Sequence, residues 1–167
     1  AVLRRSSGMS AGLALYAGWV DWGAGYGGYI SDLTRTFSVG KVEPEYDKIH
    51  RIVQQANAAG RSAGKVGAPC AAVDKAARAV IEDAGYGQYF IHRTGHSIGE
   101  EVHGNGVNID NLETKDEREL VPGICFSIEP GIYLAGEMAV RSEINVFITP
   151  DGKVDVAGEM QDSLILI

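Results

Sequence analysis

The stretch that decides the fold is residues 21–32, DWGAGYGGYISD, in which two aspartates enclose four glycines. On either side, residues 20–22 and 29–34 have the β-branched and aromatic character of strands. The glycines between them supply the positive φ angles that a chain reversal needs. The pattern therefore predicts a β-hairpin.

The register of this hairpin matters because it decides where the two aspartates lie. A turn centred between Tyr26 and Gly27 would place Asp21 directly opposite Asp32. The Cβ atoms of such a cross-strand pair lie about 4.5–5.5 Å apart, and like charges at that distance are destabilising. We therefore expect a cation between the two carboxylates, and a divalent metal is the natural candidate.

The composition limits the class of protein. The chain has 167 residues, 45% of them hydrophobic, which suits one domain over residues 1–167 with a core of its own. The net charge is −7 and no basic stripe is present, so we expect no nucleic-acid partner. Cys70 and Cys125 are too few and too far apart for a disulfide scaffold, which favours buried thiols in a reducing, cytoplasmic compartment.

The first twenty residues offer a rival interpretation. Arg4 and Arg5 precede a mildly apolar run over residues 11–20, a crude signal-peptide shape. A cut there would remove the strand that carries Asp21, so we interpret residues 13–22 as a buried strand instead. No run is long enough to span a bilayer. Because the chain begins at Ala1, we expect a fragment truncated on its N-terminal side.

Two helices follow the hairpin. Pro44 suits the first helical position, and the apolar stripe of this helix is Tyr46, Ile49, Val53, Ala56 and Gly60. Pro69 opens the second helix and Gly85 ends it. Its expected buried stripe is Val73, Ala76, Val80 and Ala84, and its expected solvent face is Asp74, Lys75, Arg78 and Glu82.

The second half is predicted to be mainly strands. Residues 105–119 form a polar loop, and strands are expected at 124–129, 140–149 and 163–167. If the chain between Glu129 and Glu143 closes as a hairpin, its midpoint is Gly136 and the two glutamates also face each other. Bulges shift register freely, so neither acidic spacing is specific by itself.

The candidate ligands form one set of four acids and one imidazole: Asp21, Asp32, Glu129, Glu143 and His96. Four carboxylates carry a charge of −4, which two divalent cations about 3.5–4 Å apart would balance. Oxygen-rich ligation with one imidazole suits Mn²⁺, and Co²⁺, Fe²⁺ and Zn²⁺ are alternatives.

Each candidate also has a plain structural interpretation. An aspartate at a strand end is commonly a solvated turn residue, and His96 could be a core histidine. His92 and His96 have the i, i+4 spacing of a helical zinc pair, but Gly95 and Gly99 argue against a helix. Arg141 could be a counter-ion or a group that orients the ligands.

The motifs in this order resemble the pita-bread metallopeptidases, in the branch of Xaa-Pro aminopeptidases and prolidases. The similar segments are residues 20–37 around the aspartates, 92–103 around the histidines, and 122–133 and 140–143 around the glutamates. The resemblance covers residues 18–167. It implies an α+β fold with a curved antiparallel sheet backed by helices, N-terminally incomplete here.

The resemblance also implies roles. Asp21, Asp32, His96, Glu129 and Glu143 would bind two metal ions, with Asp32 and Glu143 as bridging ligands. A metal-activated water would hydrolyse an N-terminal peptide bond, with Glu129 as general base and His103 and His92 stabilising the oxyanion. Arg141 and Tyr133 would support the ligands.

Two departures from the family pattern qualify this analogy. Ile144 and Asn145 follow Glu143 where the family continues Glu-Asp, and no histidine precedes His50, although the family has a substrate-binding one upstream. The alternatives are a non-catalytic peptide-binding module, or a hydrolase of methionine-aminopeptidase or creatinase type. We expect a peptide substrate, a homodimer and no membrane partner.

Overall fold

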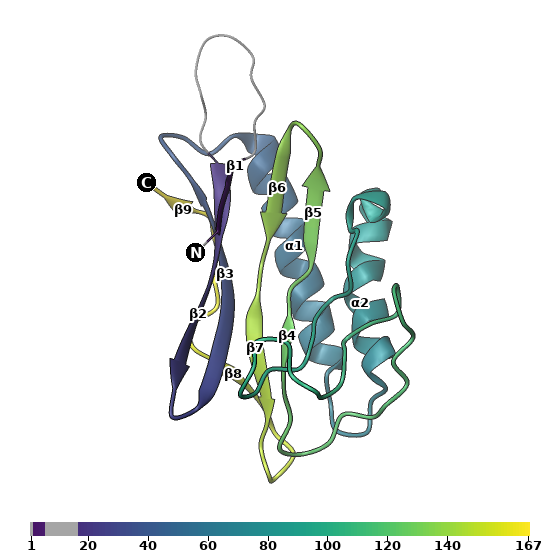
Figure 1. Cartoon of the computed structure of the whole chain (residues 1–167). Helices are drawn as coiled ribbons and strands as arrows, with labels where there is room; N and C mark the ends of the chain where they lie inside the picture. The colour runs from purple at the N-terminus through teal and green to yellow at the C-terminus, as the bar shows by residue number, and fades with distance from the viewer. Residues whose placement is uncertain (1, 6–16) are drawn as a thin grey trace.

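The computed structural model describes residues 2–5 and 17–167 of the chain. In this part the elements are β1 (Val2–Arg5), β2 (Ala17–Tyr26), β3 (Tyr29–Ser38), α1 (Pro44–Ala63), α2 (Cys70–Asp83), η1 (Gly87–Tyr89), β4 (Cys125–Ile128), β5 (Gly131–Leu134), β6 (Met138–Arg141), β7 (Ile144–Ile148), β8 (Val154–Ala157) and β9 (Ile165–Leu166). Figure 1 shows the long β2–β3 hairpin beside β7, with the two helices behind the later strands. The strands and helices together make an α+β fold.

The first hairpin forms as predicted, but its turn is one residue further along. Gly27 and Gly28 have φ angles of 60° and 88°, so these two residues make the turn and Tyr26 pairs with Tyr29. A two-residue turn with positive φ at both positions matches the twist of the flanking strands, and glycine adopts it without strain.

This register corrects the expected aspartate pair. Asp21 lies opposite Thr34, and Asp32 lies opposite Gly23. The expectation of a direct cross-strand pair is therefore wrong by two positions. Because the side-chain period of a strand is two, both carboxylates still project from the same face, as diagonal neighbours. The expected first strand begins in residues 13–16, which lie outside the described residues, as does most of the signal-like run.

The second hairpin has the predicted register. Gly131 pairs with Arg141 in the β5–β6 ladder, and Ile128 pairs with Ile144 in the β4–β7 ladder. Both ladders are centred on Gly136, which has a φ of 79°. The strand expected at 140–149 is interrupted at residues 142–143, between β6 and β7, and β8 was not predicted.

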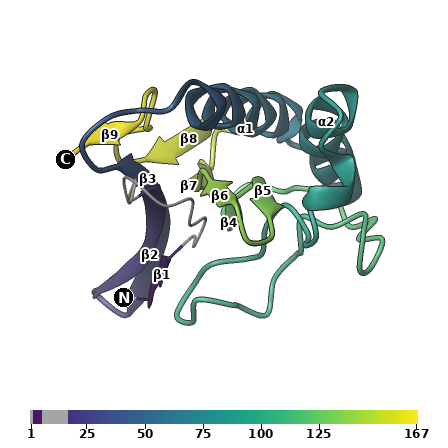
Figure 2. The same cartoon turned by 90° about the horizontal axis from the view of Figure 1, so that it is seen from above.

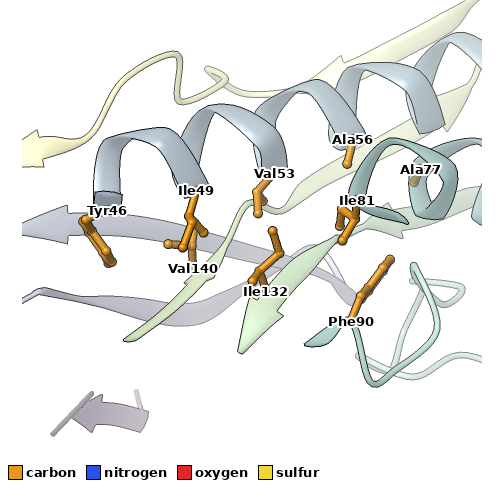
Figure 3. Close-up of a cluster of buried hydrophobic side chains, with 9 residues drawn as sticks. All are labelled: Tyr46, Ile49, Val53, Ala56, Ala77, Ile81, Phe90, Ile132 and Val140. Carbon is orange, nitrogen blue, oxygen red and sulfur yellow. The ribbon is translucent and has the colours of Figure 1, made fainter. Parts of the chain in front are cut away.

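The first helix and the core follow the sequence pattern. All five residues of the expected α1 stripe are buried. Four of them pack with residues from α2, β5, β6 and the segment after η1. Figure 3 shows this cluster: Tyr46, Ile49, Val53, Ala56, Ala77, Ile81, Phe90, Ile132 and Val140. Figure 2 shows the two helices as one layer over these strands, with the β2–β3 hairpin standing to one side.

The buried face of α2 is rotated by one residue from the prediction. Val73, Ala77 and Ile81 face the core, while Asp74 and Arg78 are buried instead of facing solvent. A shift of one residue turns a helix by about 100°. The buried face therefore includes the charged pair Asp74 and Arg78 in place of the apolar residues expected there. The two charges satisfy each other and the backbone of residues 90–94, as described below.

The remaining segments agree with the sequence pattern in outline. Residues 91–124 are irregular, with isolated bridges and no helix, so the alternative of a helical zinc pair is excluded. Cys70 is buried and Cys125 is half-buried, and both are free thiols. In the described part of the chain, no helix combines the length and the apolar composition needed to cross a membrane.

Candidate metal centre

The hairpin brings the two predicted aspartates into one acidic pair. Asp21 and Asp32 project from the same face of β2 and β3, and their carboxyl groups are close enough to share a hydrogen bond. Burial, together with the hydrogen bond and negative charge of Asp21, raises the pKa of Asp32 to about 6. Bringing these carboxylates together therefore has an electrostatic cost in the metal-free protein.

The two glutamates occupy the break between the β4–β7 and β5–β6 ladders. The backbone N–H of Ser142 donates to the carbonyl of Pro130 at 3.2 Å within this break. Glu143 is 1% exposed, and its Oε2 accepts a hydrogen bond of 2.5 Å from the hydroxyl of Thr34. Its other oxygen, Oε1, is buried and has no hydrogen-bond partner.

His96 lies between the acidic residues from the two hairpins. Its Nε2 is 3.2 Å from Oε1 of Glu129 and 3.6 Å from Oδ2 of Asp32. Asp32, His96 and Glu143 each offer one ligand atom, and these three atoms lie within 4.8 Å of one another. Burial alone would lower the pKa of His96, but the hydrogen bond with Glu129 outweighs it and the pKa is raised. Burial alone would raise the pKa of Glu129, but the same contact with His96 helps to lower it.

Arg141 is the counter-ion of the site. Its guanidinium donates to Oδ2 of Asp21, and to the hydroxyl of Thr34 at 2.9 Å. It is also 3.6 Å from Glu129 and 3.5 Å from Glu143, and it stacks on the Trp19 ring at 4.4 Å. One guanidinium does not balance four acids.

The charge imbalance is concentrated on Glu143. Burial and the neighbouring Glu129 raise the pKa of Glu143 to about 9, although Arg141 opposes this. A buried carboxylate needs either a proton or a cation to compensate its charge. The unpartnered Oε1 and the oxygen-rich donor set fit divalent cations.

The two remaining predicted histidines flank this cluster. The exposed ring of His103 lies 4.3 Å from the ring of His96, nearly perpendicular to it. His92 is further back: its Nδ1 is 2.7 Å from the carbonyl of Arg93, and its Nε2 is 2.7 Å from the Tyr133 hydroxyl. Since a carbonyl only accepts, Nδ1 carries the proton and Nε2 accepts the bond from Tyr133.

Three residues that the sequence analysis did not assign to the site complete it. Thr34 binds Glu143, as described above. Ser127 accepts the backbone N–H of His96 at 3.0 Å and donates to Glu129 at 3.2 Å. The Asn145 amide bonds both the N–H and the carbonyl of Asp32. Each lies two positions from a candidate ligand on a strand or its extension, so the two-residue period of a strand could have identified them.

The fold and this donor set define the class of metal-dependent peptidases with a pita-bread α+β fold. Residues 18–150 match the metallopeptidase family M24, and the chain belongs to that family.

Individual relatives agree with this assignment. A Xaa-Pro dipeptidase of Lactobacillus delbrueckii subsp. lactis is 41% identical over 132 residues, which cover 79% of this chain and 35% of the relative. Among solved structures, a dipeptidase from Pyrococcus horikoshii OT3 has a TM-score of 0.84 at 38% identity, covering 91% of this chain and 41% of the other. An X-Pro aminopeptidase from Thermotoga maritima MSB8 has a TM-score of 0.84 at 32% identity, with the same coverage. This chain thus spans well under half the length of these relatives.

Proposed function

We propose that residues 1–167 are the metal-binding catalytic part of a dinuclear metallopeptidase that hydrolyses an N-terminal peptide bond, of the Xaa-Pro type. The observation that carries the proposal is the buried, unpartnered Oε1 of Glu143 among three other acids and one imidazole. A carboxylate oxygen in that position is costly unless a proton or a cation compensates its charge. The names of the relatives support the peptidase reaction and the preference for proline.

In this proposal five residues hold two divalent ions: Asp21, Asp32, His96, Glu129 and Glu143. Asp32 and Glu143 would each supply carboxylate oxygens to these ions. Asp32 comes from the first sheet, whereas Glu143 lies between β6 and β7. The carboxylate-rich set favours Mn²⁺, with Co²⁺, Fe²⁺ and Zn²⁺ as alternatives.

The bound ions supply Lewis-acid activation of the attacking water. Glu129, held by Ser127 and His96, accepts the proton and passes it to the leaving nitrogen. His103, with its exposed ring beside His96, is the donor for the developing negative charge. His92 lines the substrate site, but both of its ring nitrogens are engaged, so it acts by holding the Tyr133 hydroxyl.

The proposal extends to the whole protein. The substrate is a peptide, and the longer chain works as a cytoplasmic homodimer. The rival function is a non-catalytic peptide-binding module that kept the fold, and lost ligands would mark it. The presence of all four acids and the one histidine in one connected cluster favours the enzyme.

The test measures metal binding and turnover separately. With saturating Mn²⁺ the melting temperature of the chain should rise, since a ligand at 100 times its Kd adds about 2.7 kcal/mol to stability. Asp32→Ala should abolish that rise, whereas Asp155→Ala, at an exposed position on β8, should keep it. Turnover is followed on a Xaa-Pro dipeptide and on a longer Xaa-Pro peptide with the full-length protein. A melting temperature that does not change with Mn²⁺, Co²⁺ or Zn²⁺ would contradict the proposal.

A further inference from the structure

Helix α2 carries a buried ion pair that faces the histidine segment. Asp74 is completely buried and Arg78 is 8% exposed. Nε and one terminal nitrogen of the guanidinium bind the two carboxylate oxygens, each at 3.0 Å. Such a two-point contact fixes the orientation of both groups.

The pair holds alternate residues of the segment that leads to the metal centre. Arg78 donates to the carbonyl of Phe90 at 2.9 Å and to that of His92 at 2.8 Å. Asp74 accepts from Thr94 twice, from the backbone N–H at 2.9 Å and from the hydroxyl at 2.7 Å. Residues 90, 92 and 94 are therefore fixed to the helix by four hydrogen bonds.

The other side of the same segment is fixed to β4. The backbone N–H of Glu129 donates to the carbonyl of Thr94 at 2.7 Å, and that of Ser127 donates to His96 at 2.8 Å. Gly95 allows this approach, because a Cβ there would come within 2.0 Å of the Ser127 carbonyl oxygen. Thr94 thus connects the ion pair directly to the backbone of Glu129.

Apolar side chains also hold α2 against the core. Val73, Ala77 and Ile81 attach the helix to the two apolar clusters. Replacing a buried ion pair by apolar residues of similar volume is often neutral or stabilising. A pair of charges in this position therefore serves the geometry of what it contacts more than the stability of the helix.

We propose that Asp74 and Arg78 are positioning residues that set the backbone of residues 90–94, and through it the placement of His92, His96 and Glu129. This inference rests on the proposed function for its link to metal binding. It assigns to α2 a role that its sequence pattern, with both residues expected in solvent, did not suggest.

The test uses three variants and one control. Asp74→Leu with Arg78→Met replaces the pair by apolar volume, Thr94→Val removes only one hydroxyl, and Arg78→Lys keeps the charge but loses the fork. Lys75→Ala, at an exposed position on the same helix, is the control. Mn²⁺ affinity is measured by calorimetry, unfolding by heat, and the ring nitrogens of His92 by ¹⁵N NMR of the metal-free chain at fixed pH.

We expect the double variant to melt below the wild-type temperature, because the N–H of Thr94 and the carbonyls of Phe90 and His92 lose their partners. We also expect it to bind Mn²⁺ about 10-fold more weakly, the lower end of what supporting residues contribute. The His92 nitrogen shifts should move in all three variants and not in the control, because the bond to Tyr133 lengthens. If the double variant does not fold, the two single variants give the same comparison. Wild-type affinity with unmoved His92 signals would overturn the inference. A wild-type chain that binds no Mn²⁺ would contradict the proposed function alone, and the His92 signals would still decide the positioning role.

Discussion

At the scale of single residues, Ser127 shows how much one hydroxyl can organise. It is completely buried, accepts the N–H of His96 and donates to Glu129. Its directions are fixed, since a backbone N–H only donates and an ionised carboxylate only accepts. The same side chain therefore determines the orientation of one acid and the backbone of one histidine.

Ser127→Ala should leave the His96 N–H buried without a partner. A buried donor left unsatisfied costs about 1–3 kcal/mol, and Mn²⁺ affinity should fall with it. Urea unfolding and a Mn²⁺ titration measure the two effects. Ser31→Ala, which removes a hydroxyl bonded only to the exposed Ala24 backbone, is the matched control. Equal stability of the two variants would contradict the role given to Ser127.

His103 is predicted to act on the reaction and not on the metals. Its ring is exposed and lies against His96 without belonging to the group of converging ligand atoms. His103→Ala in the full-length enzyme should keep the Mn²⁺ affinity and lose turnover by about 10²–10³-fold, as expected for one oxyanion donor. If excess Mn²⁺ instead restores the activity, His103 is a ligand and its assignment is wrong.

At the scale of elements, the sequence predicted the patterns that depend on local periodicity. The α1 stripe and the hairpin around Gly136 are correct because many residues specify each of them. The first hairpin was displaced because four glycines allow several turns, and only tertiary contacts choose Gly27 and Gly28. The buried face of α2 differs from the prediction because alanines surround it, and because Asp74 and Arg78 are buried by partners 12–20 residues away, which give no local signal.

The loop over residues 104–121 has an acid-sensitive anchor in Asp116. Its carboxylate accepts from the N–H of Asn108 at 2.8 Å and from Arg118, and its carbonyl accepts the N–H of Ala71 at the start of α2. The hydrogen bonds from Arg118 are the largest of the effects that lower the pKa of Asp116 to about 2. The loop therefore supplies the N-terminal cap that α2 lacks from its own side chains.

The pH dependence of this anchor follows from the sign of the shift. Because the folded pKa lies below the ordinary aspartate value of 3.8, the contribution of Asp116 to stability is complete above about pH 4 and is lost as the pH falls toward 2. Asp116→Asn should remove on the order of 2 kcal/mol at pH 7 and flatten the acid limb of the stability curve. Urea unfolding at several pH values measures this, and an unchanged acid limb would contradict it.

At the scale of the whole molecule, the site joins two sheets. Asn145 of β7 bonds the backbone of Asp32 of β3, the N–H at 2.9 Å, and Thr34 of β3 bonds Glu143. These are polar contacts across a boundary where each sheet presents acids to the other. Without a cation the boundary holds more negative charge than Arg141 compensates, so its stability depends on protons.

Glu143 determines whether the stability of the metal-free chain rises or falls with pH. Burial and Glu129 raise the pKa of Glu143 to about 9, far above the ordinary glutamate value of 4.5. The protonated folded form is therefore favoured, and the contribution to stability is lost as the pH rises through 9. The pKa values of His96 and of the two thiols are also raised, so the difference between the wild-type chain and Glu143→Gln isolates the contribution of Glu143. The metal-free chain should become less stable from about pH 7 to 9, and Glu143→Gln should make this decline less steep.

Metal binding should reverse this trend, because a cation takes the place of the proton on Glu143. At pH 7.5 Asp32, with a pKa of about 6, is already ionised, whereas Glu143 still holds its proton. Binding of Mn²⁺ should then release about one proton or more per chain, from Glu143 and from His96, whose pKa is also raised. At pH 5.5 the release should increase as Asp32 also loses its proton. Calorimetric titrations in buffers with different ionisation enthalpies measure this number. Heats that do not depend on the buffer would show that Glu143 is ionised before the metal arrives, and that Arg141 alone compensates the buried charge.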